Sequence, residues 1–354
     1  MTGRSAGAGA TGPAGVGGAS TVAGATATAG AGGGLPYLDA AAVGRLGTAA
    51  AVEALAGVLR AGLDPEACPQ RSAVAVPGGE LLLMPAASGA HAGVKIAGVA
   101  PGNAARGLPR ITGSYLLLDG PTLRPLALLD GAALTALRTP AVSALAVRHL
   151  TPPGRPLRLV LFGTGPQAYG HLDALRTVRS LAQVVVAGRN PAGVDALVAH
   201  ARATGLAARA GGAADVEGAD LVVCCTTARA PLFDGRLVAP GATVVAVGSH
   251  EPDARETDTA LVRRSAVYVE SRAAALREAG DLLVPEAEGA IGPGHITGTL
   301  ADLVCGRGPL PSGAAAASSA DRGCPQLFKS VGMAWEDLAV AVAVYAAAGA
   351  NSET

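Results

Sequence analysis

The chain has 354 residues, and half of them are hydrophobic, although aromatic residues make up only 3%. This length is sufficient for two domains with a sizeable core. Lysine plus arginine and aspartate plus glutamate number 27 each, so no net charge draws the chain toward nucleic acid or an acidic surface. No apolar run reaches the roughly 20 residues of a membrane span. The composition therefore favours a small-molecule partner, with no nucleic acid and no membrane.

Cysteine usage and the first residues bear on location. Five cysteines, an odd number, show neither metal-ligand spacing nor a disulfide framework. We therefore expect no metal site and a reducing, cytoplasmic environment. Residues 1–34 contain almost only glycine, alanine, threonine and serine, which predicts a disordered tail without a signal peptide.

The first half of the chain after this tail reads as an α+β arrangement. An amphipathic helix is expected from about Ala49 to Ala61, because its apolar residues share one face. A second helical pattern runs from Gly131 to Leu150. Between the helices, alternating apolar residues bounded by turn residues predict strands at Ser72–Val76, Glu80–Met84, Ala92–Val99, Ile111–Asp119 and Pro125–Leu129.

A glycine-rich turn then joins a buried strand, Leu159–Phe162, to a helix. The turn reads Gly163-Thr164-Gly165-Pro166-Gln167-Ala168. The first glycine allows a tight reversal, the second lets the backbone approach a pyrophosphate, and the small Ala168 lets the helix pack closely. The anion would bind at the helix start, where backbone N–H groups are free. This pattern predicts a dinucleotide-binding turn, and a mere tight turn is the alternative.

The end of the next strand bears on the choice of cofactor. Gln183–Ala187 is a β-branched run that ends in Gly188-Arg189-Asn190, where such folds distinguish the ribose hydroxyl from a ribose phosphate. No carboxylate stands there, and an arginine suits a 2′-phosphate. We therefore expect NADP(H) to be favoured over NAD(H). The alternative is that Arg189 is a solvated loop charge.

The remaining elements complete an α/β fold. A helix is expected at Gly193–Ala203 and a last one from Ser330 to about Ala348, with strands at Ala219–Cys225, Thr243–Val247 and Ala266–Glu270. Alternating strands and helices predict a parallel, doubly wound Rossmann sheet beside the α+β half. Thr226 and Thr227 would then lie at the carboxyl edge of that sheet, where they either contact the cofactor or form a turn.

Six sequence blocks resemble, in the same order, the ornithine cyclodeaminase and mu-crystallin family. The resemblance implies a homodimer of two-domain subunits that act on a small amino or imino acid. Its domains would be 35–150 plus 322–351 for substrate binding and dimerisation and 151–306 for the cofactor, with 307–321 as a flexible loop. The blocks are Met84-Pro-Ala with Gly93-Val-Lys95, Leu134–Thr139, Gly163–Ala168, Gly188-Arg-Asn, Val247–Glu256 and Leu327–Leu338.

Three cations match the family's substrate-carboxylate positions. They are Arg71, Lys95 and Arg138, and Met84 is assigned to the substrate side with them. Lys95 also stands out from the sequence alone, because a lysine between two apolar residues of a strand must either reach solvent or meet an anion. The alternative for each cation is an ordinary edge or surface charge.

The resemblance adds residues on the cofactor side. Val331-Gly332 resembles the family segment that lies against the nicotinamide, and Thr139 and Val247 belong to matched blocks. The expected cofactor residues are therefore Thr139, Gly163, Thr164, Gly165, Gln167, Ala168, Arg189, Asn190, Thr226, Thr227, Val247, Val331 and Gly332.

The chain also departs from the family at two positions. His250 stands where the cyclodeaminases hold an aspartate. An imidazole can pass a proton, but it is not an anion that pairs with a second ammonium, so cyclodeamination of ornithine is disfavoured. A surface role for His250 is the alternative. Pro140 replaces a usual alanine, which the first turn of a helix tolerates.

These residues together predict an NAD(P)H-dependent oxidoreductase acting on the C=N or CH–NH bond of a small α-imino or α-amino acid. The expected reaction delivers hydride to C2 of a cyclic ketimine such as 1-pyrroline-2-carboxylate. The cations orient the carboxylate, and Lys95 and His250 are the catalytic candidates. The alternatives are an amino-acid or N-substituted amino-acid dehydrogenase, an ornithine cyclodeaminase, and a non-catalytic, crystallin-like cofactor-binding protein.

Overall fold

The computed structural model describes residues 34–307 and 323–350. The expected tail over 1–34 and the expected loop over 307–321 lie almost wholly outside these ranges. The first described half forms strands, α-helices and short 3₁₀ helices (η) in the order β1 (Tyr37–Leu38), α1 (Ala40–Gly44), α2 (Thr48–Arg60), η1 (Pro65–Ala67), β2 (Ser72–Val76), β3 (Gly79–Ser88), β4 (His91–Val99), η2 (Pro101–Arg106), β5 (Ile111–Asp119), β6 (Pro125–Asp130) and α3 (Gly131–Leu150).

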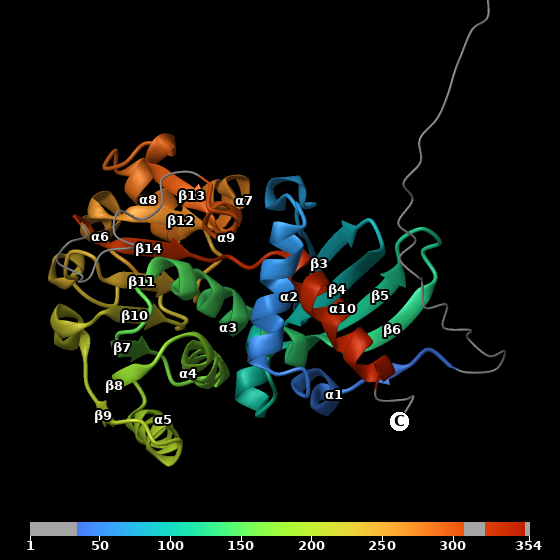
Figure 1. The fold of residues 1–354 in the computed structure, drawn as a ribbon, viewed down its shortest axis with the longest axis horizontal. Coiled ribbons are helices and arrows are strands. Elements are labelled where there is room, and N and C mark those ends of the chain that lie inside the picture. Colours follow the sequence, from blue (N-terminus) through green and yellow to red (C-terminus); the bar gives the residue numbers. More distant parts are fainter. Residues whose placement is uncertain (1–33, 308–322, 351–354) are drawn as a thin grey trace, which may run out of the picture. The chain divides into compact units, whose positions relative to one another are not determined.

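The second half alternates strands with helices (Figure 1). Its elements are β7 (Leu157–Phe162), α4 (Pro166–Val178), β8 (Leu181–Ala187), α5 (Pro191–Ala203), β9 (Ala208–Ala210), η3 (Ala213–Gly218), β10 (Leu221–Cys224), η4 (Gly235–Leu237), β11 (Thr243–Ala246), α6 (Thr259–Arg264), β12 (Ala266–Val269), α7 (Arg272–Glu278), α8 (Gly280–Ala287), η5 (Pro293–His295), β13 (Ile296–Thr299), α9 (Leu300–Cys305), β14 (Gln326–Lys329) and α10 (Ala334–Ala350). Every helix in these ranges is too short or too polar to cross a bilayer.

The first sheet has the strand order β1-β6-β5-β4-β3-β2 and is antiparallel except for the pairing of β1 with β6. One face is buried and packs against α3 and α10, and Figure 1 shows α10 crossing the strands. Alternation along the strands places Leu82, Met84 and Ala86 of β3, with Lys95 of β4, on this inner side.

The opposite face of the first sheet is apolar and not covered within the described residues. It carries leucine, isoleucine and valine side chains from β2 to β6 that are half-buried or exposed, and Ile96 at the middle is 44% exposed. Its members, by strand register, include Val74, Val76, Leu81, Leu83, Val94, Ile96, Leu116 and Leu128. We call this surface the outer sheet face. An apolar face of this extent is typical of an interaction surface.

The second sheet is parallel throughout, with the order β13-β12-β14-β11-β10-β7-β8-β9. The chain builds outward from β7 in one direction through β8 and β9, and then returns to build in the other direction from β10. This is the doubly wound arrangement that the alternation of elements predicts, so the expected fold class is confirmed. Ligands in such sheets bind where the direction reverses, at the carboxyl ends of the strands.

One part of the expected domain division is wrong. Residues from 322 onward were expected to join the first domain, but Gln326–Lys329 forms β14, a buried inner strand of the second sheet between β11 and β12. Among the described residues after 322, it is α10 that packs against the first sheet. A strand of four residues that is buried on both faces shows no alternation, so its sequence carries little strand signal.

The expected place of Pro140 is also wrong. Pro140 lies inside α3 rather than in its first turn, and the helix continues past it to Leu150. Its ring faces α4 at Gly170, where an added Cβ would come within 2.8 Å of Pro140 Cγ. The glycine therefore makes room for the proline ring where the two helices cross.

A similar close contact explains Gly93 in β4. A Cβ at this position would lie 2.4 Å from Tyr115 Oη and 2.7 Å from two ring carbons. Tyr115 of β5 is fully buried, so its ring has no room to move aside. The glycine thus permits a large aromatic side chain to fill the core beside Lys95.

We predict that Gly93→Ala lowers the free energy of unfolding by about 1–3 kcal/mol, because the added methyl group overpacks a closed core. The matched control is Gly98→Ala on the same strand, where the nearest atom to the new Cβ is 3.4 Å away. Urea denaturation of both variants measures the difference. Equal effects of the two substitutions would show that Tyr115 does not limit position 93.

Candidate active site

The three predicted substrate cations converge on one segment of the chain, Val331–Asp337, which includes the end of the connection between β14 and α10 and the first turn of α10. Arg71 precedes β2, Lys95 is in β4 and Arg138 is in α3. Each makes a hydrogen bond or ion pair with a residue of the segment. The structure therefore brings together residues that lie far apart in the sequence.

Lys95 meets an anion that belongs to the protein itself. Its Nζ lies 2.7 Å from Oδ2 of Asp337 and 3.4 Å from the hydroxyl of Thr135. The lysine is only 3% exposed, so it does not reach solvent. Burial lowers the pKa of Lys95 to about 8, although the charge of Asp337 acts in the opposite direction.

Arg138 is bound by both acidic residues of α10. Its NH1 lies 2.6 Å from Oε2 of Glu336, and its Nε lies 3.2 Å from Oδ1 of Asp337. Both acids are fully buried. The guanidinium also explains Gly332, which has a φ of +75° and leaves no room for a Cβ beside Arg138.

The carboxyl group of Glu336 is buried near a second acidic residue, Glu270. Burial, followed by the neighbouring Glu270, raises the pKa of Glu336 well above its usual value. Glu270 accepts hydrogen bonds from Ser330 Oγ (2.5 Å) and from the backbone N–H groups of Val331 and Gly332. Glu270 therefore holds the Val331-Gly332 backbone in place.

Arg71 and Glu278 form an ion pair, and both residues line a small cavity. Arg71 NH2 lies 2.8 Å from Oε2 of Glu278 in α7, and it donates to the carbonyls of Val331 (2.9 Å) and Gly332 (2.6 Å). The cavity has a volume of about 20 Å³, and the buried Met84 also lines it. Met84 and Arg71 thus line the same cavity.

The glycine-rich turn has the geometry that a pyrophosphate requires. Gly163 has a φ of +116°, and a Cβ there would lie 2.6 Å from the carbonyl oxygen of Cys225. Gly165 precedes α4 without any side-chain cap, and the space beside it is open. Gln167 Oε1 is buried and has no hydrogen-bond partner among the described residues, while Ala168 is fully buried. These residues fit a nicotinamide dinucleotide.

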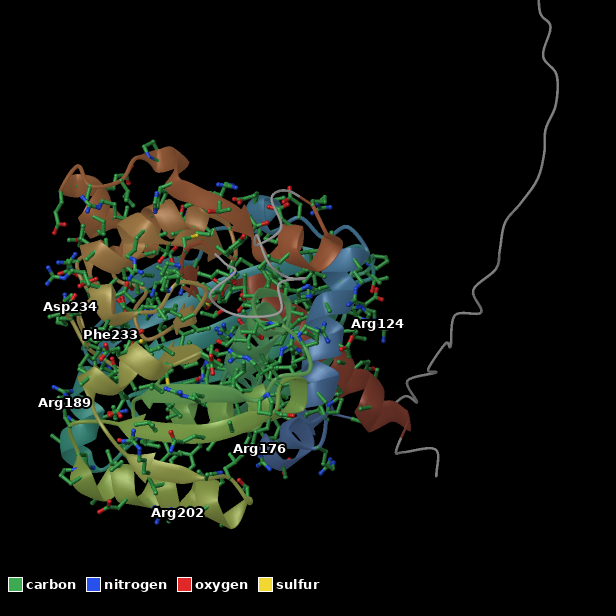
Figure 2. The ribbon with its side chains drawn as sticks, turned by 60° about the vertical axis from the view of Figure 1, so that its left-hand side comes forward. Arg124, Arg176, Arg189, Arg202, Phe233 and Asp234 are labelled. Carbon is green, nitrogen blue, oxygen red and sulfur yellow. The ribbon has the colours of Figure 1, made fainter. Side chains whose placement is uncertain are left out.

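The residues after β8 lie beside this turn. The side chain of Thr164 sits between Gly188 and Gly193, where added Cβ atoms would come within 2.8 Å of it. Arg189 is exposed and makes no hydrogen bond or ion pair within residues 34–307 and 323–350 (Figure 2). Asn190 caps α5 without using its side chain. Both side chains are therefore free to contact a ligand.

Thr226 has the turn role that was the alternative for it. Its hydroxyl donates to Oε1 of the buried Glu256 (2.8 Å) and accepts from the N–H of Ala228 (3.1 Å). Glu256 also binds the N–H groups of Thr226 and Gly248, so it joins the ends of β10 and β11. The other expected cofactor residues differ in exposure, since Thr227 is exposed, Thr139 and Val247 are half-buried, and Val331 is buried.

The two singled-out histidines differ in their surroundings. His250 is exposed in the loop after β11, and partial desolvation followed by the charge of Arg71 lowers its pKa. This places it near the Arg71 side of the site. His171 in α4 is buried and bonded through both ring nitrogens, to Ser143 Oγ and the Gln167 carbonyl oxygen. His171 is therefore a structural residue.

Sequence reasoning missed the acidic half of the site. Asp337, Glu336, Glu270 and Glu278 neutralise or position the cations, and none was assigned a role. A signal was present for the first two, because Glu336-Asp337 interrupts the apolar residues of the last helix as Lys95 interrupts its strand. Charged residues inside apolar patterns are expected to find partners.

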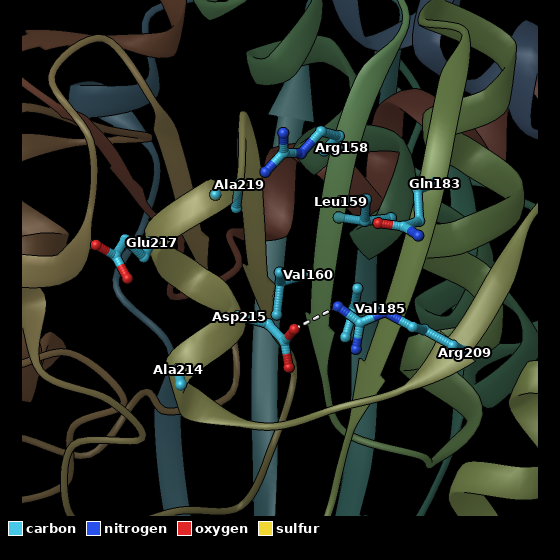
Figure 3. A pocket seen from close by; sticks show the side chains of 11 residues that line it. Arg158, Leu159, Val160, Gln183, Val185, Arg209, Ala214, Asp215, Glu217 and Ala219 are labelled. Carbon is cyan, nitrogen blue, oxygen red and sulfur yellow. Dashed lines mark hydrogen bonds and ion pairs between the residues drawn. The ribbon is translucent and has the colours of Figure 1, made fainter.

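A larger cavity lies elsewhere, over β7, β8 and β9 (Figure 3). Its volume is about 370 Å³, and its walls include Arg158, Arg209 and Glu217. None of the predicted site residues lines it. It lies alongside the strands rather than at their carboxyl ends, so we do not assign the reaction to it.

Known proteins resemble the chain over most of its length. A Δ(1)-pyrroline-2-carboxylate reductase of Colwellia psychrerythraea is 39% identical over 241 residues, which is 67% of this chain and 73% of that protein. The ketimine reductase mu-crystallin of Rattus norvegicus is 34% identical over 271 residues, 75% of this chain and 80% of the other.

A solved structure shares the fold. The Δ(1)-pyrroline-2-carboxylate reductase of Thermococcus litoralis, in complex with NADH and L-proline, superposes with a TM-score of 0.80 at 29% identity. The match covers 90% of this chain and 98% of that one. The sequence model of the ornithine cyclodeaminase/mu-crystallin family matches residues 46–352. The chain therefore belongs to the ornithine cyclodeaminase/mu-crystallin family.

Proposed function

We propose that this protein is an NAD(P)H-dependent oxidoreductase that reduces the C=N bond of a small α-imino acid, with cyclic ketimines such as 1-pyrroline-2-carboxylate as its substrates. The names of its relatives support the reaction, since they are reductases of this imine class. Family membership and the glycine-rich turn support the cofactor.

The observation that carries the proposal is the convergence of three cations on one stretch of the chain. Lys95 and Arg138 both contact Asp337, and Arg71 donates to the carbonyls of Val331 and Gly332. Basic side chains that the scaffold fixes in this way can hold the carboxylate of an α-imino acid.

The residues of this chain position the reaction. Arg71, Lys95 and Arg138 hold the carboxylate, and Met84 closes the apolar side, so that C2 of the substrate is fixed beside Val331-Gly332. The bound nicotinamide supplies a hydride. His250 is the nearby group that can exchange a proton with the product amine. His250 has no negative charge in either protonation state, which argues against cyclodeamination of a diamino acid.

We further propose that the protein prefers NADP(H). No carboxylate follows β8 at the position where one would bind the ribose hydroxyl and repel a 2′-phosphate, and Arg189 is exposed there without a protein partner among the described residues. Because the five cysteines are free thiols, we also propose that the protein is in the cytoplasm.

The outer sheet face supports a homodimer. Burying this apolar surface against a second copy would remove it from water, and one continuous patch can pair with itself across a two-fold axis. Residues 35–150 with α10 would then form the substrate-binding and dimerisation part, and 151–306 with β14 the cofactor-binding part.

Lys95→Ala should lower kcat/KM for the imino acid by at least about 100-fold, roughly 3 kcal/mol, because it removes a cation from the carboxylate site. Affinity for the cofactor should be unchanged. Steady-state kinetics that follow NADPH absorbance, with calorimetric cofactor titration, measure both quantities. A folded alanine variant with normal turnover would refute the role of Lys95.

The pH dependence gives a second measurement at Lys95. Since the pKa of Lys95 is lowered to about 8, its positive charge is lost as the pH rises through this value, and kcat/KM should fall above about pH 8. Asp337, Arg138 and Glu336 face the ammonium and must remain in the variant used for comparison. In Lys95→Arg the fall should move to higher pH even if activity is only partly restored. A fall that stays in place would belong to the substrate imine instead.

Binding of NADPH should exceed that of NADH by roughly 1–3 kcal/mol, the scale of a charge-assisted hydrogen bond. Arg189→Ala should remove most of this preference and leave NADH affinity nearly unchanged. Isothermal titration of both cofactors against both proteins tests it. Equal dissociation constants in the unaltered protein would contradict the preference for NADPH.

Ile96→Glu should convert the dimer to a monomer, because it places a charge at the middle of the outer sheet face. Leu276→Glu is the matched control, since Leu276 is also exposed but lies on α7. Light scattering coupled to gel filtration reads the mass of each variant. A dimeric Ile96→Glu protein would rule out this face as the interface.

A further inference from the structure

We propose that Glu278 binds the nitrogen of the substrate, so that Glu278 and Arg71 together recognise the adjacent opposite charges of an imino acid. The inference depends on the proposed function and adds a residue to it. Glu278 is on α7, which belongs to the half of the chain that forms the second sheet. Arg71 precedes β2 of the first sheet.

The two oxygens of Glu278 have different surroundings. Oε1 accepts hydrogen bonds from Arg277, at 2.7 Å from NH2 and 3.1 Å from Nε. Oε2 is buried 2.8 Å from Arg71, yet the angles there are not those of a hydrogen bond, and no described residue donates one to it. A buried carboxylate oxygen without a donor is costly, and it marks a place for a donor that is absent from the chain.

Arg71 is also only partly used by the protein. Its contacts to Glu278, Val331 and Gly332 all involve NH2. NH1 and Nε make no hydrogen bond in the described parts of the chain. Arg71 and Glu278 both line the cavity beside Met84 and Met333. The NH1 and Nε groups of Arg71 and the Oε2 atom of Glu278 are therefore available to a ligand in the same small cavity.

A protonated α-imino acid has a carboxylate and an N–H⁺ on neighbouring atoms. Without ligand, Arg71 and Glu278 neutralise each other. When the ligand binds, its carboxylate pairs with the guanidinium of Arg71, and its N–H⁺ donates a hydrogen bond to Oε2 of Glu278. Each charge therefore keeps an opposite partner, and no buried charge is left without one. The space of about 20 Å³ holds one water molecule, so the flexible side chains of Met84 and Met333 must also shift.

The reaction leaves Glu278 unchanged. Hydride adds to C2 with its electron pair, and the π electrons of the C=N bond become the lone pair of the nitrogen, which keeps its proton. The imine is reduced and the nicotinamide is oxidised. Glu278 stabilises the protonated, electrophilic form of the imine and remains a carboxylate throughout. His250 cannot replace it, because an imidazole offers no negative charge at neutral pH.

The test compares two ligands that differ at one atom, L-proline and tetrahydrofuran-2-carboxylate, in which the ring nitrogen is replaced by oxygen. Dissociation constants are measured by calorimetry with NADPH present, so no turnover is needed. The unaltered protein should bind L-proline at least about 10-fold more tightly than the oxygen analogue. Glu278→Gln should weaken L-proline about 10- to 100-fold and the analogue less than about 3-fold.

The matched control is Glu288→Gln, because Glu288 is an exposed acid after α8 that does not line the cavity. It should leave both affinities unchanged. If Glu278→Gln weakens both ligands equally, Glu278 acts only through Arg71, and the proposal is wrong. It is also wrong if neither affinity changes.

If Glu278→Gln does not fold, the same measurements are made on Glu278→Asp. This variant keeps the negative charge, but its side chain is shorter by one methylene group. It should weaken the binding of L-proline more than that of the analogue, and equal weakening overturns the proposal.

Turnover of 1-pyrroline-2-carboxylate is measured first in the unaltered protein. If no cyclic imino acid is reduced, the proposed function fails and this inference with it. Turnover with an unchanged ligand preference in Glu278→Gln overturns only the role of Glu278.

Discussion

The structure depends on the compensation of charges that are buried between the first sheet and the helices α3 and α10. Lys95 and Arg138 point inward from a strand and a helix, and Asp337, with no exposed surface, contacts both of them. Removing a charge from water costs several kcal/mol in a protein interior, and a fold keeps such a charge only where a partner offsets the loss. The first turn of α10 supplies that partner. The position of this helix therefore determines which cations the site can contain.

The segment between β14 and α10 connects the two halves of the site. Glu270 holds its N–H groups at Val331 and Gly332, Arg71 holds the carbonyls of the same residues, and Glu336 and Asp337 follow in the first turn of α10. Glu270 follows β12 of the second sheet and Arg71 precedes β2 of the first, so the bonds of both residues tie this segment to both sheets. A shift of Val331-Gly332 would therefore move groups on the cofactor side and on the substrate side together. The backbone here is bonded through side chains because it lies between regular elements.

The sequence predicted those features that repeat along the chain. β2, β5 and α3 were predicted with the observed bounds, because alternation or helical spacing marks each of them clearly. It also predicted that Lys95 either reaches solvent or meets an anion, but Asp337 lies 242 residues away, and no local pattern joins the two. Glu278 looks like a member of an exposed Arg277-Glu278 pair, and its position beside Arg71 exists only in the folded chain. β14 was missed because four residues buried on both faces have no period.

The position of β14 also determines the order in which the second sheet can be completed. β11 and β12 precede it in the chain, yet both pair with β14 and not with each other. During synthesis these two strands emerge with the slot between them empty, and the backbone groups on both sides of the slot stay unpaired until residues 326–329 appear. Unpaired strand edges attract other chains. The nascent protein therefore keeps these two edges open until β14 has been made, and a chain truncated before β14 would retain two open edges inside its own sheet.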